Sequence, residues 1–330
     1  MQNTQVILQE RPQGMVAESN FTVQQGPIGE IEEGQVLIKI AYISLDPAMR
    51  GWMNAGTTYI KGVEIGAVMR AFAIGEIIAS KHAKYPVGTW VEGLLGAQSH
   101  AISTGQGLRI VPADQGNLSW HLGILGMPGM TAYFGLLERG KPEAGETVFV
   151  SGAAGIVGST VGQIAKIKGC RVIGTAGSDQ KCKYLIEECG FDAAINYKTQ
   201  DVKAELARHA PDGIHVFYDN VGGPLLDTAL GRLARGARVV ICGAISQYNA
   251  TEMYGPKNYM KIVTARGYLT GIIVFDFLER YPEAIAQIHE WLRGGKMKTK
   301  EHIFEGIEQF PAVLKKLYTG ENFGKLLIKV

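Results

Sequence analysis

The spacing of apolar and polar residues changes its character near residue 125. Before that point, short apolar runs alternate with glycines and prolines, and these runs cover residues 35–44, 73–80, 89–95 and 107–111. Short strands at close intervals predict a compact, mostly β, barrel-like domain. We place this first domain at residues 1–125.

After that point, apolar runs of strand length alternate with stretches of helical periodicity. The predicted strands are 147–151, 171–175, 193–197, 214–219, 237–242 and 268–275, and a helix at 282–293 follows the last of them. This alternation predicts a parallel, doubly wound sheet over residues 126–300. The tail, 301–330, contains a helix at 307–318 and an apolar strand at 326–330, which we expect to pair with the first domain.

The strongest chemical signal is a glycine-punctuated turn between the strand at 147–151 and the helix that follows it. Ala153, Gly155 and Gly158 have the spacing Ala-x-Gly-x-x-Gly. Gly155 would let the backbone approach a pyrophosphate, Gly158 would let the helix pack close to the strand, and the helix amino end would offer N–H groups to the anion. This context predicts a dinucleotide site, and the alternative is a strand-to-helix turn without a ligand.

The end of the strand at 171–175 distinguishes the two nicotinamide dinucleotides. NAD-binding sites usually place a carboxylate there to hold the ribose 2′-hydroxyl. Here Ser178 and Lys181 follow, which would suit a 2′-phosphate and therefore favour NADP(H). Asp179 is able to reach a ribose, but Ser178 and Asp179 also suit the start of a helix at 181–189. For Lys181 the alternative is an ordinary surface lysine.

The composition is that of an ordinary soluble globular protein with room for two domains. Hydrophobic residues make up 46% and charged residues 19% of the chain, and the formal net charge is +2. Because basic and acidic residues are nearly equal in number, the charge does not indicate nucleic acid or an anionic membrane as a partner, and we expect a small-molecule substrate. The four cysteines follow no metal or disulfide spacing, and we see no secretion signal, so we expect a cytoplasmic protein.

Six segments, taken together, resemble one known family. They are 44–51 (SLDPAMRG), 126–133 (GMPGMTAY), the glycine turn, 219–223 (DNVGG), 242–249 (CGAISQYN) and 322–325 (NFGK). In this order along the chain they resemble the zinc-independent leukotriene B4 12-hydroxydehydrogenase/prostaglandin reductase family of the medium-chain dehydrogenases/reductases. That family contains NADPH-dependent alkenal and alkenone reductases, including bacterial curcumin reductase.

The resemblance implies a Rossmann domain beside a GroES-like barrel, NADP(H) as cofactor, and reduction of the C=C bond of α,β-unsaturated aldehydes and ketones. The pyrophosphate would be held by Gly155, Ile156, Val157 and Gly158, and the 2′-phosphate end by Ser178, Lys181 and Tyr197. The other implied residues follow the cofactor to its nicotinamide: Asn220, Cys242, Gly243, Ala244, Ile245, Tyr248, Ile273, Val274 and Asn322. For Asn220 and Asn322 the alternative is a residue that only stabilises a turn.

The first domain offers no recognisable set of zinc ligands. Zinc alcohol dehydrogenases need a cysteine and a histidine there, but the first cysteine of this chain is Cys170, so we expect no metal. Conjugate reduction needs no Lewis acid, because hydrogen-bond donors stabilise the enolate that forms when hydride adds to the β-carbon. In the family, a tyrosine that matches Tyr248 is implicated in this role, and a phenol stays protonated at neutral pH. The alternative is a tyrosine packed for stability.

The chain departs from the family where substrate would bind, because Ala48, residues 96–100 and Ile272 lack the aromatic groups found there. Two other functions therefore stay open. A zinc-independent quinone oxidoreductase would accept a ring substrate, and a non-catalytic NADPH-binding protein would not need Tyr248. We also expect a homodimer, because the strand at 268–275 would form the edge of a six-stranded sheet and residues 272–275 are apolar.

Overall fold

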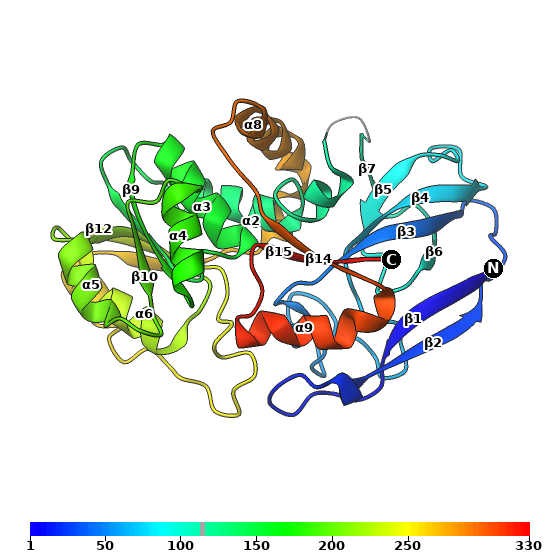
Figure 1. Ribbon diagram of the computed structural model, residues 1–330, viewed down its shortest axis with the longest axis horizontal. Helices are drawn as coiled ribbons and strands as arrows, with labels where there is room; N and C mark the ends of the chain where they lie inside the picture. The colour runs from blue at the N-terminus through cyan, green and yellow to red at the C-terminus, as the bar shows by residue number, and fades with distance from the viewer. Residues whose placement is uncertain (113–115) are drawn as a thin grey trace. The chain divides into compact units, whose positions relative to one another are not determined.

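The computed structural model describes residues 1–112 and 116–330. It divides into two compact units, Met1–Gly123 with Glu301–Val330, and Ile124–Lys300 (Figure 1). Each unit has a hydrophobic core of its own. None of the described helices combines the length and the apolar character that crossing a bilayer requires.

The first unit is mostly β. Its main sheet has the strand order β14-β15-β3-β4-β5-β7, β6 pairs with β3, and β1 and β2 form a separate antiparallel pair. The strands are β1 Gln2–Leu8, β2 Phe21–Pro27, β3 Val36–Ser44, β4 Ala73–Ser80, β5 Trp90–Gly93, β6 His100–Ser103, β7 Arg109–Ile110, β14 Glu301–Glu305 and β15 Lys325–Lys329. The helical segments are η1 Glu18–Asn20, α1 Met49–Trp52, η2 Leu118–Leu122, η5 Ile307–Gln309 and α9 Phe310–Thr319.

The end of the chain lies inside this sheet. Strand β15 pairs in parallel with β14 and antiparallel with β3, where Ile328 lies opposite Ile43. Residues 326–328 are at most 1% exposed. The expected return of the tail to the first domain is therefore confirmed, and burial of these apolar side chains provides the physical reason.

A buried lysine fixes the start of the last strand. The Lys325 ammonium donates to Ser44 Oγ at 2.6 Å, to the Leu45 carbonyl at 3.0 Å and to Asp46 Oδ1 at 2.7 Å. These three acceptors match the three hydrogens of an ammonium group, which is why the Lys325 side chain is tolerated at 1% exposure. The motif segments 44–51 and 322–325, distant in sequence, are thus joined by an ion pair.

The second unit is built on a six-stranded parallel sheet in the order β10-β9-β8-β11-β12-β13. Counted from its first strand, this is the Rossmann order 3-2-1-4-5-6, which confirms the predicted doubly wound sheet. The strands are β8 Thr147–Val150, β9 Arg171–Ala176, β10 Ala193–Asn196, β11 Ile214–Asp219, β12 Leu233–Ile241 and β13 Tyr268–Gly271. The helical segments are α2 Met127–Phe134, η3 Gly135–Gly140, α3 Ile156–Ile167, α4 Asp179–Glu187, α5 Val202–His209, α6 Gly223–Leu230, α7 Lys261–Ala265, η4 Val274–Arg280 and α8 Tyr281–Arg293.

Successive side chains of β11 show how the two faces of this sheet are covered. Phe217 stacks on Phe149 with ring centroids 5.0 Å apart and packs in the cluster that contains Leu206 of α5 and Leu226 of α6. The next residue, Tyr218, points to the opposite face, where its hydroxyl donates to the Thr131 carbonyl of α2 at 2.8 Å. Figure 1 shows α3 and α4 on one side of the sheet and α5 and α6 on the other.

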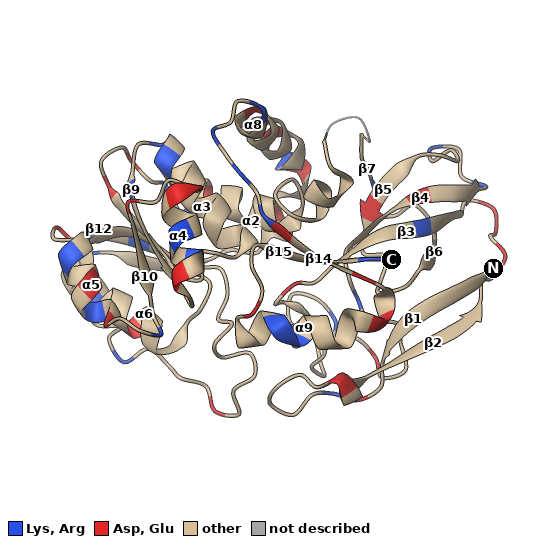
Figure 2. Ribbon diagram, viewed as in Figure 1, with Lys and Arg blue, Asp and Glu red and all other residues tan. Residues whose placement is uncertain are grey.

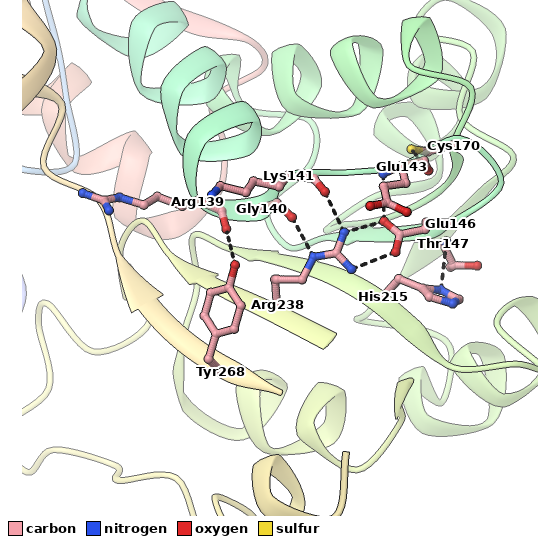
Figure 3. A network of polar contacts seen from close by, with 10 residues as sticks. All are labelled: Arg139, Gly140, Lys141, Glu143, Glu146, Thr147, Cys170, His215, Arg238 and Tyr268. Carbon is pink, nitrogen blue, oxygen red and sulfur yellow. Dashed lines mark hydrogen bonds and ion pairs between the residues drawn. The ribbon is translucent and has the colours of Figure 1, made fainter. Parts of the chain in front are cut away.

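A polar network closes the edge at which the strands begin (Figure 3). Arg238 of β12 donates through Nη1 to Glu146 Oε1 at 2.8 Å, and its Nη2 pairs with the other carboxylate oxygen. Its Nε also donates to the Gly140 carbonyl at 2.8 Å, and Nη2 to that of Lys141 at 2.8 Å. Lys141 has a φ of 44°, so the arginine holds the end of η3 in a left-handed conformation that side chains rarely adopt.

The strand predicted at 268–275 is wrong in its second half. Strand β13 ends at Gly271, which lies opposite Ile241, the last residue of β12. Ile272 still donates its N–H to the Ile241 carbonyl at 3.2 Å, but the chain then turns into η4. Ile272 and Val274 are buried by this turn, so the apolar run belongs to a packed loop and not to an exposed strand.

Candidate active site

The glycine turn lies at the carboxyl edge of the Rossmann sheet, between β8 and α3. Gly155 is the residue that precedes the helix, and a Cβ there would meet only the Gly152 oxygen at 3.5 Å. At Gly158 a Cβ would lie 2.6 Å from the same oxygen and 2.7 Å from Ala153 Cα, a contact that excludes any side chain. Gly158 thus packs tightly against the turn, and the backbone at Gly155 is left open.

The start of α3 provides the donors that a pyrophosphate needs. The first intrahelical bond of this region runs from the Ser159 N–H to the Gly155 carbonyl at 2.9 Å. The N–H groups of Ile156, Val157 and Gly158 precede it, and the first turn of a helix leaves such groups without helical acceptors. Together with the helix dipole, they favour an anion at this point.

The end of β9 carries the residues predicted for a 2′-phosphate. Ser178 caps α4, where its Oγ accepts from the Lys181 N–H at 3.3 Å. A Cβ on Gly177 would lie 2.7 Å from the Tyr197 hydroxyl and 3.4 Å from Cε of Lys198. Ser178, Tyr197 and Lys198 are therefore gathered at one place, beside the first turn of α4.

Lys198 was not among the residues singled out from the sequence. Burial lowers the pKa of Lys181, and the nearby charge of Lys198 lowers it further. Charges of both signs alternate along α4 and α5 (Figure 2). At this strand end, Lys181 and Lys198 are close enough for the charge of Lys198 to affect the pKa of Lys181. The signal in the sequence was a second cation directly after Tyr197 at the end of a predicted strand.

The Asp179 carboxylate forms a hydrogen bond within the protein, which competes with binding to a ribose hydroxyl. Asn196 Nδ2 donates to its Oδ1 at 2.6 Å, and Asn196 Oδ1 accepts from the Lys198 N–H at 3.2 Å. The carboxylate thus ties the start of α4 to the end of β10. This geometry supports the interpretation of Asp179 as a residue of the first helical turn.

Asn220 follows β11 directly and faces the start of the glycine turn. Its side-chain Nδ2 donates to the Ser151 carbonyl at 2.8 Å, and its own N–H donates to Ser151 Oγ at 2.8 Å. Strands β8 and β11 are neighbours in the sheet, and the chain leaves them toward opposite ends of the strand order. In sheets of this kind the ligand binds where that divergence occurs.

The segment after β12 forms a tight loop around Gly243. The N–H groups of Cys242 and Gly243 donate to the Asp219 carbonyl at 2.9 and 3.2 Å, and the Ile245 N–H donates to that of Asn220 at 3.1 Å. Burial raises the pKa of the Cys242 thiol to about 12, although a hydrogen bond with Tyr218 opposes the effect. Cys242 is therefore a neutral thiol and not a nucleophile.

Tyr248 folds back over this loop. Its phenolic oxygen accepts a hydrogen bond from the Ala244 N–H at 3.2 Å. A Cβ on Gly243 would lie 2.7 Å from the same oxygen, so a side chain at that position would displace the Tyr248 hydroxyl. A phenol whose oxygen accepts a hydrogen bond is a stronger donor through its own hydrogen, because the two bonds polarise each other.

The remaining predicted residues lie at two other places. Ile273 and Val274 come just after β13; Ile273 is 38% exposed and Val274 is 7% exposed. Asn322 belongs to the first unit and lies in the segment before β15, two residues ahead of Gly324, which has a φ of 70°. Over residues 1–112 and 116–330, no cluster of three or more His, Cys, Asp or Glu side chains is arranged to hold a metal ion.

Known proteins match both parts of the chain. Residues 4–111 match the family described as the N-terminal domain of oxidoreductase, and residues 157–290 match the one described as zinc-binding dehydrogenase. The NADPH-dependent curcumin reductase of Escherichia coli (strain K12) is 40% identical, over 99% of this chain and 97% of that protein. The NADP(+)-dependent 2-alkenal reductase of Nicotiana tabacum is 38% identical over the same shares of the two chains.

A solved structure agrees with these matches. The crystal structure of CurA from Vibrio vulnificus in complex with NADPH has a TM-score of 0.95, with 40% sequence identity and 99% of both chains covered. The chain belongs to the leukotriene B4 12-hydroxydehydrogenase/prostaglandin reductase family. As a member of this family it is an oxidoreductase, with the Rossmann domain and the β-rich GroES-like domain of the medium-chain dehydrogenases/reductases.

Proposed function

We propose that this protein uses NADPH to reduce the C=C bond of α,β-unsaturated aldehydes and ketones. The relatives named above as curcumin reductase and 2-alkenal reductase support this reaction class. The residues of the second unit support the cofactor, because the glycine turn fits a pyrophosphate and the end of β9 presents cations to a 2′-phosphate. When bound, the nicotinamide supplies a hydride to the β-carbon of the substrate.

The residues of the chain then have distinct tasks. Ile156, Val157 and Gly158 donate backbone N–H groups to the pyrophosphate. Ser178, Lys181 and Tyr197 hold the 2′-phosphate, and Asn220, the 242–245 loop, Ile273 and Val274 contact the rest of the cofactor. These groups fix the orientation in which the hydride is delivered, and correct orientation alone lowers the barrier substantially.

Tyr248 is the residue to which we assign the chemistry on the substrate oxygen. As hydride adds to the β-carbon, negative charge moves to the carbonyl oxygen, where the phenolic hydrogen of Tyr248 donates a hydrogen bond. The contact from Ala244 to the phenolic oxygen carries this assignment, because it both orients the ring and strengthens the phenol as a donor.

Replacing Tyr248 with Phe tests the proposal. The variant should keep its NADPH affinity and lower kcat for an enone by about 10- to 100-fold, since loss of an oxyanion donor costs roughly 10²–10³ and solvent replaces part of it. Quinones disperse the negative charge, so their reduction should fall less. Both reactions are followed by NADPH consumption.

Tyr254→Phe is the matched control. The Tyr254 hydroxyl lies on the same loop but donates to Asp227 Oδ2 at 2.8 Å, so its loss should leave the ratio of enone to quinone turnover unchanged. Unchanged enone turnover in Tyr248→Phe would show that this tyrosine is a packing residue and would favour a quinone reductase. Absence of any turnover in the wild type with enals, enones and quinones would favour a non-catalytic NADPH-binding protein.

We also propose that the protein forms a homodimer through β13. This strand is an edge of the sheet, and Tyr268 and Leu269 on it are 46% and 43% exposed. Ile272 and Val274 are buried, so they offer no apolar surface for this contact. The remaining apolar edge would be covered by the same strand of a second copy.

A further inference from the structure

The second unit contains a carboxylate that none of the roles above requires. Asp219, the last residue of β11, is 0% exposed, and so is its neighbour in space, Ser151. Burial raises the pKa of Asp219, and hydrogen bonds from Ser151, Val221 and Gly222 oppose that effect. Within the described residues no ion pair compensates the charge, so hydrogen bonds alone stabilise it.

The Asp219 carboxylate accepts hydrogen bonds from Ser151, at the end of β8, and from the turn that follows Asn220. Ser151 Oγ donates to Oδ1 at 2.6 Å, and the Val221 N–H donates to the same oxygen at 2.9 Å. The Gly222 N–H is shared between the two carboxylate oxygens at 3.1 Å. Gly222 has a φ of 69°, so the carboxylate closes a turn that only glycine forms without strain.

Ser151 links this turn to the start of the glycine turn. Its hydroxyl donates to Asp219 and accepts from the Asn220 N–H at 2.8 Å, while its carbonyl accepts from Asn220 Nδ2 at 2.8 Å. One hydrogen of the Asn220 amide is thereby fixed on Ser151. The direction of the other amide hydrogen and of Oδ1 follows from this contact.

The position of the Ser151–Asp219–Asn220 network in the sheet indicates its role. Ser151 and Asp219 stand at the carboxyl ends of β8 and β11, the two strands between which the order of the sheet reverses. The Asp219 carbonyl also accepts from Cys242 and Gly243, the first residues of the loop that leads to Tyr248. One buried residue therefore joins the glycine turn, Asn220 and the 242–245 loop.

We propose that Ser151 and Asp219 are positioning residues that hold the Asn220 amide for the nicotinamide end of NADPH. The inference rests on the proposed function, because it takes Asn220 as a cofactor contact. Ser151 and Asp219 do not touch the cofactor themselves. The Ser151 hydroxyl and the Asp219 carboxylate hold the backbone at Asn220 and in the turn after it, and this backbone sets where the Asn220 side chain starts. Their loss should therefore act only through Asn220.

A double-mutant cycle in cofactor binding tests this dependence. NADPH affinity is measured from its own fluorescence for the wild type, Ser151→Ala, Asn220→Ala and the double variant. Loss of one well-placed hydrogen bond corresponds to about a tenfold change in affinity, so Ser151→Ala and Asn220→Ala should each raise Kd by about that factor. In the Asn220→Ala background, Ser151→Ala should change Kd by less than about twofold, because the group that it orients is gone.

A fragment of the cofactor separates positioning from general damage. Adenosine 2′,5′-bisphosphate lacks the nicotinamide, so calorimetry should give the same affinity for this fragment in Ser151→Ala and the wild type. The proposal would be overturned if Ser151→Ala raised the NADPH Kd by the same factor with and without the Asn220 side chain, or if it weakened binding of the fragment as much as binding of NADPH. Either result would show that Ser151 only supports the fold. Thr264→Ala removes an exposed hydroxyl that donates to the Lys261 carbonyl, and it should change neither affinity.

Asp219→Asn provides a second variant that keeps the shape of the side chain. It retains one carbonyl oxygen for Ser151 and Val221 but removes the charge, and it should weaken NADPH while leaving the fragment unaffected. Unaltered NADPH affinity in this variant would overturn the role of Asp219. If the wild type itself failed to bind NADPH, the proposed function would be wrong, and that outcome is separate from any result of the cycle.

Discussion

At the scale of single residues, the surroundings of a charge decide its role. Asp179 has the charge that would repel a 2′-phosphate, but its contact with Asn196 fixes it at the start of α4. Lys181 and Lys198 have like charges, and their proximity costs free energy that a bound anion would offset. The pair therefore predicts a phosphate more strongly than Lys181 does alone.

Replacing either lysine should weaken NADPH selectively. Lys181→Ala and Lys198→Ala should each raise the NADPH Kd by about fivefold or more and leave the NADH Kd nearly unchanged, because only the phosphate loses a charged partner. Lys203→Ala, at an exposed position of α5, is the control and should alter neither value. Equal losses for NADPH and NADH would remove these lysines from the 2′-phosphate site.

The two lysines should also set the pH dependence of cofactor affinity. The pKa of Lys181 is lowered by burial and by Lys198, so its ammonium is lost at a lower pH than that of an ordinary lysine. NADPH affinity should therefore fall as the pH rises through that lowered value. In Lys198→Ala the loss of NADPH affinity should occur at a higher pH than in the wild type, and a titration of Kd against pH measures the shift.

At the scale of elements, we assign stability to the edge where the strands begin and cofactor binding to the opposite edge. Arg238→Met should lower the free energy of unfolding by roughly 1.5–3 kcal/mol, because it removes the charge-assisted hydrogen bonds of the partly buried Glu146 carboxylate. NADPH affinity should stay unchanged. Urea titration measures the first quantity and cofactor fluorescence the second, and a large change in Kd would contradict this separation.

The same pair should make stability depend on pH. Burial would raise the pKa of Glu146, but hydrogen bonds from Arg238 and from the Glu143 N–H outweigh it, and the net pKa is lowered. The stability that the pair contributes is thus fully present above the ordinary glutamate pKa and is lost as the pH falls through the lowered one. Glu146→Gln should be less stable at pH 7 and should lack this acid-dependent loss.

The elements also show how far the sequence predicts the fold. The βα alternation identified the Rossmann strands because the central ones, such as β8 and β9, are almost continuously buried runs. Strands β1 and β2 were missed because their sequences, QNTQVIL and FTVQQGP, mix polar residues that face solvent with the few that are buried. The end of β13 was placed wrongly because the sequence does not show where the neighbouring β12 ends.

The site was predictable only in part for a similar reason. The glycine turn and the end of β9 lie in continuous segments, so their spacing could be read directly. The contacts of Asp219 with Ser151 and of Asn196 with Asp179 join residues that are 68 and 17 positions apart, so no local sequence pattern predicts them. Lys198 became a candidate only when the structure placed it near Lys181.

At the scale of the whole molecule, the edge of the Rossmann sheet predicts self-association. Tyr268 and Leu269 leave apolar surface beside unpaired backbone groups on β13, and such an edge is a template for pairing. Pairing of β13 with its copy across a two-fold axis would extend the sheet and leave the carboxyl edge of each unit unchanged. Sedimentation velocity at micromolar concentration should therefore show a dimer.

A charge placed on this edge should separate the two copies. Leu269→Lys puts an ammonium group where the second copy would pack, so the variant should sediment as a monomer and keep the NADPH affinity of the wild type. Ile102→Lys adds the same charge at a 40% exposed position on β6 and should leave the dimer intact. A wild type that sediments as a monomer, or a Leu269→Lys variant that remains dimeric, would contradict an interface at β13. Dimerisation through another surface would then leave the exposed Tyr268 and Leu269 for a different partner.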